Sequence, residues 1–246
     1  MIRFILVMIF AFVVLVLGSP MLLIEWMIGK INKEKMDISS LRIAQWAFRV
    51  VLRMVGVKIT YIGEERVPQD QPVLYVGNHR SIFDVLVTYV KCKNLTGFVA
   101  KNEVEHVPFL STWMRRLYCL FLNRTDIKEG LKTILQAIEY VKSGVSIFIF
   151  PEGTRNKNDS ELELLEFHAG SFKIAQKTGC PIVPVAMNGT VEIWEKQFPK
   201  MKSCHVVVEY CEPIIMSELD KEDKKHIGEY TQNIIRETLK KNQELL

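Results

Sequence analysis

The chain has 246 residues, of which 48% are apolar and 24% charged, so its composition is that of a folded protein and excludes a disordered chain. Its length suits one large α/β domain, or such a domain with an appendage. The net charge of +4 at pH 7 suits anionic head groups or phosphorylated ligands, and it is too small to predict nucleic-acid binding.

The first predicted element is hydrophobic. No charged residue occurs between positions 4 and 24, a length that would just cross a bilayer as one continuous helix. Pro20 interrupts this stretch, because proline disfavours helix in the residue before it. We therefore expect residues 1–30 to form a membrane anchor, either one kinked span or a hairpin that dips into one leaflet. Arg3 and Lys30 flank the two ends, and charge on both sides slightly favours both ends being cytoplasmic.

Residues 31–56 are predicted to hold an amphipathic interfacial helix. Apolar residues recur at helical spacing, and Gly56 provides a stop. Arg42, Arg49 and Arg53 share another face of this helix. Two interpretations remain open: the basic face lies on an anionic membrane surface, or the helix packs on the following domain.

Residues 57–246 alternate short apolar strands with helices, which predicts an α/β domain with a mostly parallel mixed sheet covered by helices on both faces. The expected strands are 57–62, 73–76, 96–100, 118–122, 146–150, 181–187 and 205–210. The expected helices are 84–91, 107–117, 127–142, 171–177 and 221–246. The polar segment 156–166 is expected to be a mobile loop. Five cysteines without a CxxC pair favour reduced thiols in a cytosol-facing protein over a zinc site or a disulfide framework.

A histidine and an aspartate follow the second expected strand. His79 comes directly after Gly77-Asn78, and Asp84 lies five positions later, at or just before the start of a helix. An aspartate that orients an imidazole makes a general base able to activate a weak nucleophile such as an alcohol.

A second group of polar residues follows the apolar strand 146–150. Its sequence is Pro151-Glu152-Gly153-Thr154-Arg155, and another arginine, Arg124, follows the strand ending at Leu122. Ligands of open α/β sheets bind beyond the carboxyl ends of the strands, and arginine suits bidentate capture of phosphate. Together these residues predict a site for an anionic substrate that carries an alcohol.

At this point the chain resembles the glycerolipid acyltransferase family, in particular the bacterial 1-acylglycerol-3-phosphate acyltransferases. Four blocks occur in the family's order: Asn78-His79 to Asp84 (NHxxxxD), residues 101–124, Phe150 to Arg155, and Ile182 to Val185. The resemblance implies a glycerol-3-phosphate acyltransferase-like fold over residues 57–246.

The resemblance also implies a reaction. His79, oriented by Asp84, would deprotonate the 2-hydroxyl of lysophosphatidic acid, which would then attack the thioester of acyl-CoA or acyl carrier protein to give phosphatidic acid. The phosphate would be held by Arg124 and the segment Glu152, Gly153, Thr154 and Arg155, with Glu152 fixing Arg155. Lys101 or the Gly153 N–H would stabilise the oxyanion. No metal ion or cofactor is expected.

Two other functions remain open from the sequence. The acceptor could be another lysolipid, such as a lyso-ornithine lipid, or the chain could be a non-catalytic lipid-binding protein of the same fold. The expected partners are membrane lipid, lysophosphatidic acid and the acyl donor, with no nucleic acid. The expected location is the cell membrane, with the active site facing the cytoplasm.

Overall fold

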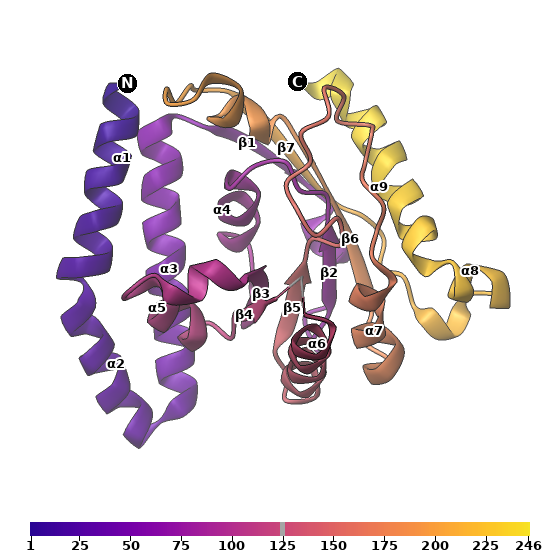
Figure 1. Ribbon diagram of the computed structural model, residues 1–246, viewed down its shortest axis with the longest axis horizontal. Coiled ribbons are helices and arrows are strands. Elements are labelled where there is room, and N and C mark those ends of the chain that lie inside the picture. The colour runs from indigo at the N-terminus through magenta and orange to yellow at the C-terminus, as the bar shows by residue number, and fades with distance from the viewer. Residues whose placement is uncertain (124–125) are drawn as a thin grey trace.

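The computed structural model describes residues 1–123 and 126–246, and within them one seven-stranded sheet separates two layers of helices (Figure 1). The strand order across the sheet is β1-β7-β6-β2-β5-β3-β4. The strands are β1 (Lys58–Ile62), β2 (Leu74–Gly77), β3 (Thr96–Lys101), β4 (Leu120–Leu122), β5 (Ser146–Ile149), β6 (Ile182–Asn188) and β7 (His205–Tyr210).

The sheet is mostly parallel. Strands β4, β3, β5, β2 and β6 run parallel to one another, whereas β7 pairs antiparallel with β6 and carries the edge strand β1 parallel to itself. The predicted α/β class and the mixed, mostly parallel sheet are therefore confirmed. One consequence matters for function: the carboxyl ends of β2, β5 and β6 lie side by side at one edge.

Side chains alternate between the two faces of the sheet, so a strand contributes side chains to an apolar core on each face. In β2, Tyr75 faces one core while Leu74 and Val76 face the other. The first core is covered by α1 (Ile2–Phe12), α3 (Lys33–Val55), α4 (Phe83–Tyr89) and α5 (Leu110–Arg116). The second is covered by α6 (Ile127–Lys142), α7 (Lys173–Thr178) and α9 (Ile227–Asn242); in Figure 1, α6 lies at the lower centre and α9 on the right.

The N-terminal hydrophobic segment is a bent helical arm. Helix α1 continues through a π-helical turn, Val13–Leu17, into α2 (Ser19–Ile31), with a bend of 44° between the two parts. Among the described residues, no individual helix is both long enough and hydrophobic enough to cross a bilayer. The two parts of this bent pair, taken together, have the length and the composition that a crossing would need. Helix α3 then runs back along the arm (Figure 1).

Helix α3 packs on the domain with its apolar face. Leu41, Val51 and Val55 are buried in the first core. Buried Gln45 donates from Nε2 to the carbonyls of Tyr89 (3.2 Å) and Cys92 (2.7 Å), at the end of α4. The sequence left two interpretations of this helix open, and the apolar face of α3 is seen to pack on the domain.

Three predicted elements differ from the structure. Helix α5 begins at Leu110, because Phe109 adopts a φ of 61°. The predicted C-terminal helix is divided at His226 into α8 (Lys221–Lys225) and α9. The segment 156–166 is held to its surroundings by hydrogen bonds, including one from the Leu165 N–H to Glu152 and one from the Gly189 N–H to Glu161. Polar composition alone did not reveal these local partners.

Candidate active site

The end of β2 is locked between its two neighbouring strands. A Cβ on Gly77 would lie 2.9 Å from the Met187 methyl and 3.1 Å from the Phe148 ring, so any other residue there would require these side chains to shift. Asn78 continues the pairing with its side chain, accepting from the Met187 N–H (2.9 Å) and donating to the Met187 carbonyl (3.0 Å). The residue that follows, His79, therefore leaves the sheet at a defined point.

His79 and Asp84 form the predicted pair. His79 Nδ1 lies 2.9 Å from Asp84 Oδ2, and Asp84 is fully buried near the start of α4. The same oxygen accepts the backbone N–H groups of Arg80 (2.7 Å) and Ser81 (2.8 Å), which leaves the carboxylate well fixed. A carboxylate at Nδ1 favours the tautomer with hydrogen on Nδ1, so that Nε2 is free to accept a proton. The geometry is that of an oriented general base.

The backbone of His79 is held on both sides by the segment after β5. Its N–H donates to Glu152 Oε1 (2.7 Å), and its carbonyl accepts the Asn156 N–H (2.7 Å). The second oxygen of Glu152 accepts the Leu165 N–H (2.9 Å). Burial raises the pKa of Glu152, partly offset by these hydrogen bonds. Glu152 therefore joins two loops rather than facing open solvent.

Arg155 is paired with a residue that the sequence did not single out. Its Nη1 lies 3.4 Å from Glu195 Oε1, and the guanidinium side chain is 49% exposed. Glu195 also accepts from the Ser81 hydroxyl (2.7 Å) and the Ile82 N–H (2.9 Å). The expectation that Glu152 fixes Arg155 was wrong, because the Glu152 oxygens are engaged by backbone N–H groups and Glu195 pairs with Arg155.

The other predicted site residues have mixed outcomes. Gly153 has a φ of +71° and its N–H donates to the Phe150 carbonyl (3.0 Å), so this N–H is not free to bind an oxyanion. Thr154 is exposed in the same turn. Lys101 ends β3 at the same edge of the sheet, but it is 57% exposed and pairs with Glu103 at 2.5 Å. Arg124 lies outside the described residues.

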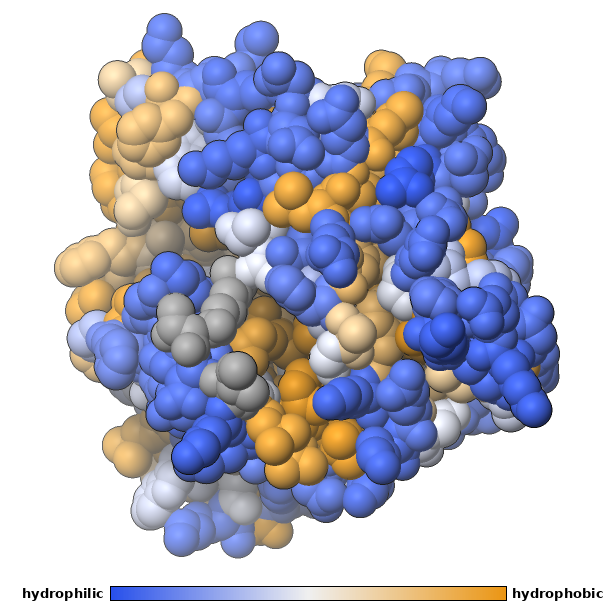
Figure 2. Space-filling model, turned by 45° about the vertical axis from the view of Figure 1, so that its right-hand side comes forward, coloured by the Kyte–Doolittle hydropathy of each residue, from blue (hydrophilic) through white to orange (hydrophobic). Residues whose placement is uncertain are grey.

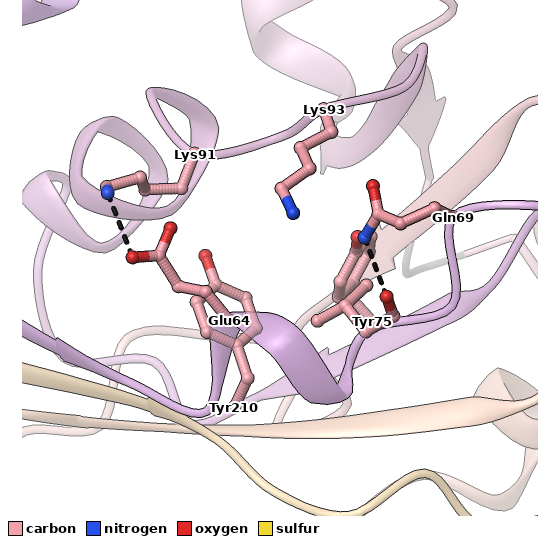
Figure 3. A pocket seen from close by; sticks show the side chains of 7 residues that line it. Glu64, Gln69, Tyr75, Lys91, Lys93 and Tyr210 are labelled. Atoms are coloured by element: carbon pink, nitrogen blue, oxygen red, sulfur yellow. Dashed lines mark hydrogen bonds and ion pairs between the residues drawn. The ribbon is translucent and has the colours of Figure 1, made fainter.

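Two hollows lie near the sheet. One, of about 350 Å³, is bordered by Arg80, Arg155 and Glu195, and Arg80 directly follows His79 in the chain. The other, of about 10 Å³, lies between Tyr75, Tyr210 and the side chains drawn with them in Figure 3, where Lys91 pairs with Glu64. The second hollow has room for about one water molecule, so it cannot hold a lipid head group.

The cysteine thiols are not suited to act as a nucleophile at this site. Four of the five are buried, and all five have free thiols. Burial raises the pKa of Cys92 to about 12 and that of Cys119 to about 11, which keeps these thiols protonated at neutral pH. These thiols are therefore poor candidates for the nucleophile that an oriented His79 would activate.

Sequence reasoning missed Arg80, Asn156 and Glu195. Asn156 and Glu195 act on the site through contacts with residues far away in the chain, which no local pattern records. Arg80 had one available signal, because it directly follows His79 in the first block.

The matching acyltransferase family model covers residues 58–188, which include the His79–Asp84 pair and the Glu152–Arg155 segment. The chain is 30% identical over 203 residues to the 1-acyl-sn-glycerol-3-phosphate acyltransferase of Saccharomyces cerevisiae, covering 80% of this chain and 65% of that relative. It is 30% identical over 179 residues to the enzyme of the same name from Borreliella burgdorferi, covering 71% of this chain and 70% of that relative.

A crystal structure with the same fold is known. The crystal structure of the 1-acyl-sn-glycerophosphate acyltransferase PlsC from Thermotoga maritima superposes with a TM-score of 0.84 at 23% identity, covering 98% of this chain and 95% of that one. The likeness extends over the N-terminal helices as well as the sheet. Taken with the matched family model and the relatives, these findings show that the chain belongs to the acyltransferase family of enzymes.

Proposed function

We propose that this protein transfers a fatty acyl group from acyl-CoA or acyl carrier protein to the 2-hydroxyl of 1-acylglycerol-3-phosphate, giving phosphatidic acid. The observation that carries the proposal is the 2.9 Å contact between His79 Nδ1 and the fully buried Asp84, held at the end of a buried strand. The names of the similar yeast and Borreliella enzymes support the choice of acceptor.

The reaction needs one proton to move twice. His79 Nε2 takes the proton from the acceptor hydroxyl as its oxygen attacks the thioester carbonyl, and Asp84 stabilises the imidazolium that forms. The tetrahedral intermediate collapses by breaking the C–S bond, and the imidazolium returns the proton to the thiolate. Because a thioester is already an activated acyl group, the proposal calls for no metal ion and no cofactor.

The acceptor's phosphate needs cations beyond the strand ends. Arg155 suits this role, because its guanidinium is half exposed and its 3.4 Å contact with Glu195 is long for an ion pair. Arg124 is proposed for the same role from its place in the sequence alone.

We further propose that the protein lies on the cytoplasmic side of the cell membrane, bound through α1 and α2. Large hydrophobic side chains on these helices and on the turn between them are exposed, among them Phe12 (63%), Leu17 (69%) and Trp26 (52%). Figure 2 shows hydrophobic side chains along its left margin, on the side where the arm lies in Figure 1. An exposed apolar surface of this kind fits a lipid surface.

The test is an acceptor panel with purified full-length protein in phospholipid vesicles, measuring thiol release from acyl-CoA or acyl carrier protein. Lysophosphatidic acid should be the preferred acceptor, and His79→Ala should lower turnover at least a hundredfold while the unfolding temperature stays close to that of the wild type. Equal use of a phosphate-free monoacylglycerol, or of a lyso-ornithine lipid, would reject this acceptor. Full activity of His79→Ala would reject the mechanism.

A further inference from the structure

The cavity of about 350 Å³ beside the His79 loop is built mainly from charged residues. Its lining includes four cationic side chains, Arg80, Arg155, Lys157 and Lys196, and two carboxylates, Asp159 and Glu195. The Glu195 carboxylate is already engaged by Arg155, Ser81 and Ile82, and the Lys196 ammonium is paired with Glu192. Arg80 and Lys157 have no ion-pair partner among the described residues. The cavity is therefore suited to an anion.

Arg80 differs from the other cations in this wall because it is buried. The residue is 4% exposed, whereas Arg155 and Lys196 are about half exposed. Its Nη2 donates to the Asn158 carbonyl, but Nε and Nη1 have no hydrogen-bond partner among the described residues. A guanidinium is always charged, and a buried charge without a counter-charge is costly. Two buried donors without a partner, on a residue that lines the cavity, point to an anionic ligand.

The backbone of Arg80 explains why the side chain is placed here. Its N–H donates to Asp84 Oδ2 at 2.7 Å, so the residue is fixed beside the general base at one end. Its guanidinium reaches the segment 156–159 at the other end, through Asn158. The cavity wall and the base are thus consecutive residues of one loop.

We propose that Arg80 is a phosphate-binding residue of the acceptor site, which, together with Arg155, holds the phosphomonoester of the lysolipid. The identity of the ligand rests on the proposed function. In 1-acylglycerol-3-phosphate the reacting hydroxyl and the phosphate are on adjacent carbons, so a phosphate pocket must lie close to His79. The phosphates of a CoA donor are separated from its thioester by the long pantetheine arm, which fits a site next to the base less well.

The decisive experiment separates the Michaelis constants of the two substrates. In full-length protein, Arg80→Gln should raise KM for lysophosphatidic acid at least tenfold and leave KM for the acyl donor within about twofold. Arg80→Lys keeps the charge but lacks the two-nitrogen fork, so it should fall between the wild type and Arg80→Gln. Lys142→Gln removes an equal charge from an exposed pair on α6 and should change neither constant. A rise in the donor's KM alone, or no change in either, would overturn the proposal.

A second measurement does not depend on turnover. Inorganic phosphate should raise the unfolding temperature of the wild type and of His79→Ala, because a ligand that binds only the folded state stabilises it. It should do so much less for Arg80→Lys, and for Arg80→Gln if that variant folds. Equal stabilisation of the wild type and Arg80→Lys would contradict the proposal. If the wild type is stabilised by phosphate but does not acylate lysophosphatidic acid, the proposed function fails while the phosphate site stands.

Discussion

At the scale of single residues, Asp84 acts through one oxygen. Oδ2 accepts from His79 Nδ1 and from two backbone N–H groups, whereas Oδ1 has no hydrogen-bond partner in the part of the chain described. The two backbone groups fix the carboxylate without help from the imidazole. His79 is therefore oriented by a group that is itself rigid.

This arrangement predicts how Asp84→Asn will behave. The amide oxygen can still accept the three N–H groups, so the geometry survives, but the negative charge that stabilises the imidazolium is lost. We expect kcat to fall by about 10²–10⁴-fold, with KM for the acceptor changed little. Steady-state kinetics in vesicles measure both constants. A kcat within twofold of the wild-type value would show that the carboxylate charge is not needed.

Replacement of Gly153 is predicted to be destabilising for two separate reasons. Its φ of +71° strains any other residue, and a Cβ would lie 3.0 Å from His168 Nε2. Gly179 has nearly the same φ, +73°, but no atom within 4 Å of its Cβ position. Gly179→Ala should therefore cost about 1 kcal/mol of stability, from the backbone alone. Gly153→Ala should cost more, as thermal unfolding would show, and should also lower acyl transfer in an activity assay. Equal losses of stability in the two variants would show that the close approach to His168 adds no cost.

The raised pKa of Glu152 predicts a pH dependence of stability. Because burial raises this pKa above the ordinary value of 4.5, the folded chain holds the proton more tightly than the unfolded chain does. The stability of the wild type relative to Glu152→Gln should therefore fall as pH rises from about 4.5 through the raised pKa, and level off above it. Glu152→Gln also changes stability by an amount that does not depend on pH. The test is therefore the slope of the stability difference between the two proteins against pH.

Unfolding temperatures measured from pH 4 to pH 8 would test this. Glu139→Gln, at an exposed position that pairs with Lys142, serves as the control for removing a glutamate charge outside the site. A relative stability of the wild type that increases with pH would mean that the hydrogen bonds to Glu152 outweigh its burial.

At the scale of elements, α3 supports the helix that carries Asp84. Gln45 donates two hydrogen bonds to carbonyls at the carboxyl end of α4, while Asp84 lies at the other end of that helix. We expect Gln45→Ala to lower the free energy of unfolding by roughly 1–3 kcal/mol, because buried carbonyls lose their donor. Arg53→Ala on the exposed face of α3 should change it by no more than about 0.5 kcal/mol. Chemical unfolding in detergent measures both, and equal values would contradict the bracing role of Gln45.

The sequence predicted elements better than it predicted contacts. Continuous apolar runs such as 146–149 identified the buried strands, and strand ends followed by glycine placed His79 and Arg155 at one edge. Pairing between distant segments was not predictable, because the hydrogen bond that Ser81 donates to Glu195 depends on how β6 and β2 meet in the sheet. The burial of Arg80 depends on the path of the segment 156–159, which only the folded chain defines.

At the scale of the whole molecule, the hydrophobic arm is part of the same body as the site. Phe4 of α1 stacks on Trp194 with 6.0 Å between ring centroids. The next residue, Glu195, holds Arg155 and the loop that follows His79. The arm that carries the proposed membrane surface is thus linked through Trp194 and Glu195 to Arg155, which is proposed to bind the phosphate. This link suits an acceptor that is itself a membrane lipid.

This arrangement predicts a separation between membrane binding and chemistry. Phe12→Glu and Leu17→Glu place charges on the exposed face of the arm, where a carboxylate facing lipid is unfavourable. We expect the double variant to lose at least tenfold in affinity for phospholipid vesicles, measured by flotation, and to show a higher apparent KM for vesicle-borne acceptor. Leu131→Glu, at a 52% exposed position on α6, adds the same kind of charge away from the arm and should bind vesicles like the wild type.

With a short-chain, water-soluble lysophosphatidic acid, the arm variant should keep a kcat within about threefold of the wild-type value, because His79 and Asp84 are untouched. Loss of turnover on that soluble acceptor would mean that the arm is required for the geometry of the site itself, and unchanged flotation would mean that another surface holds the protein on the membrane.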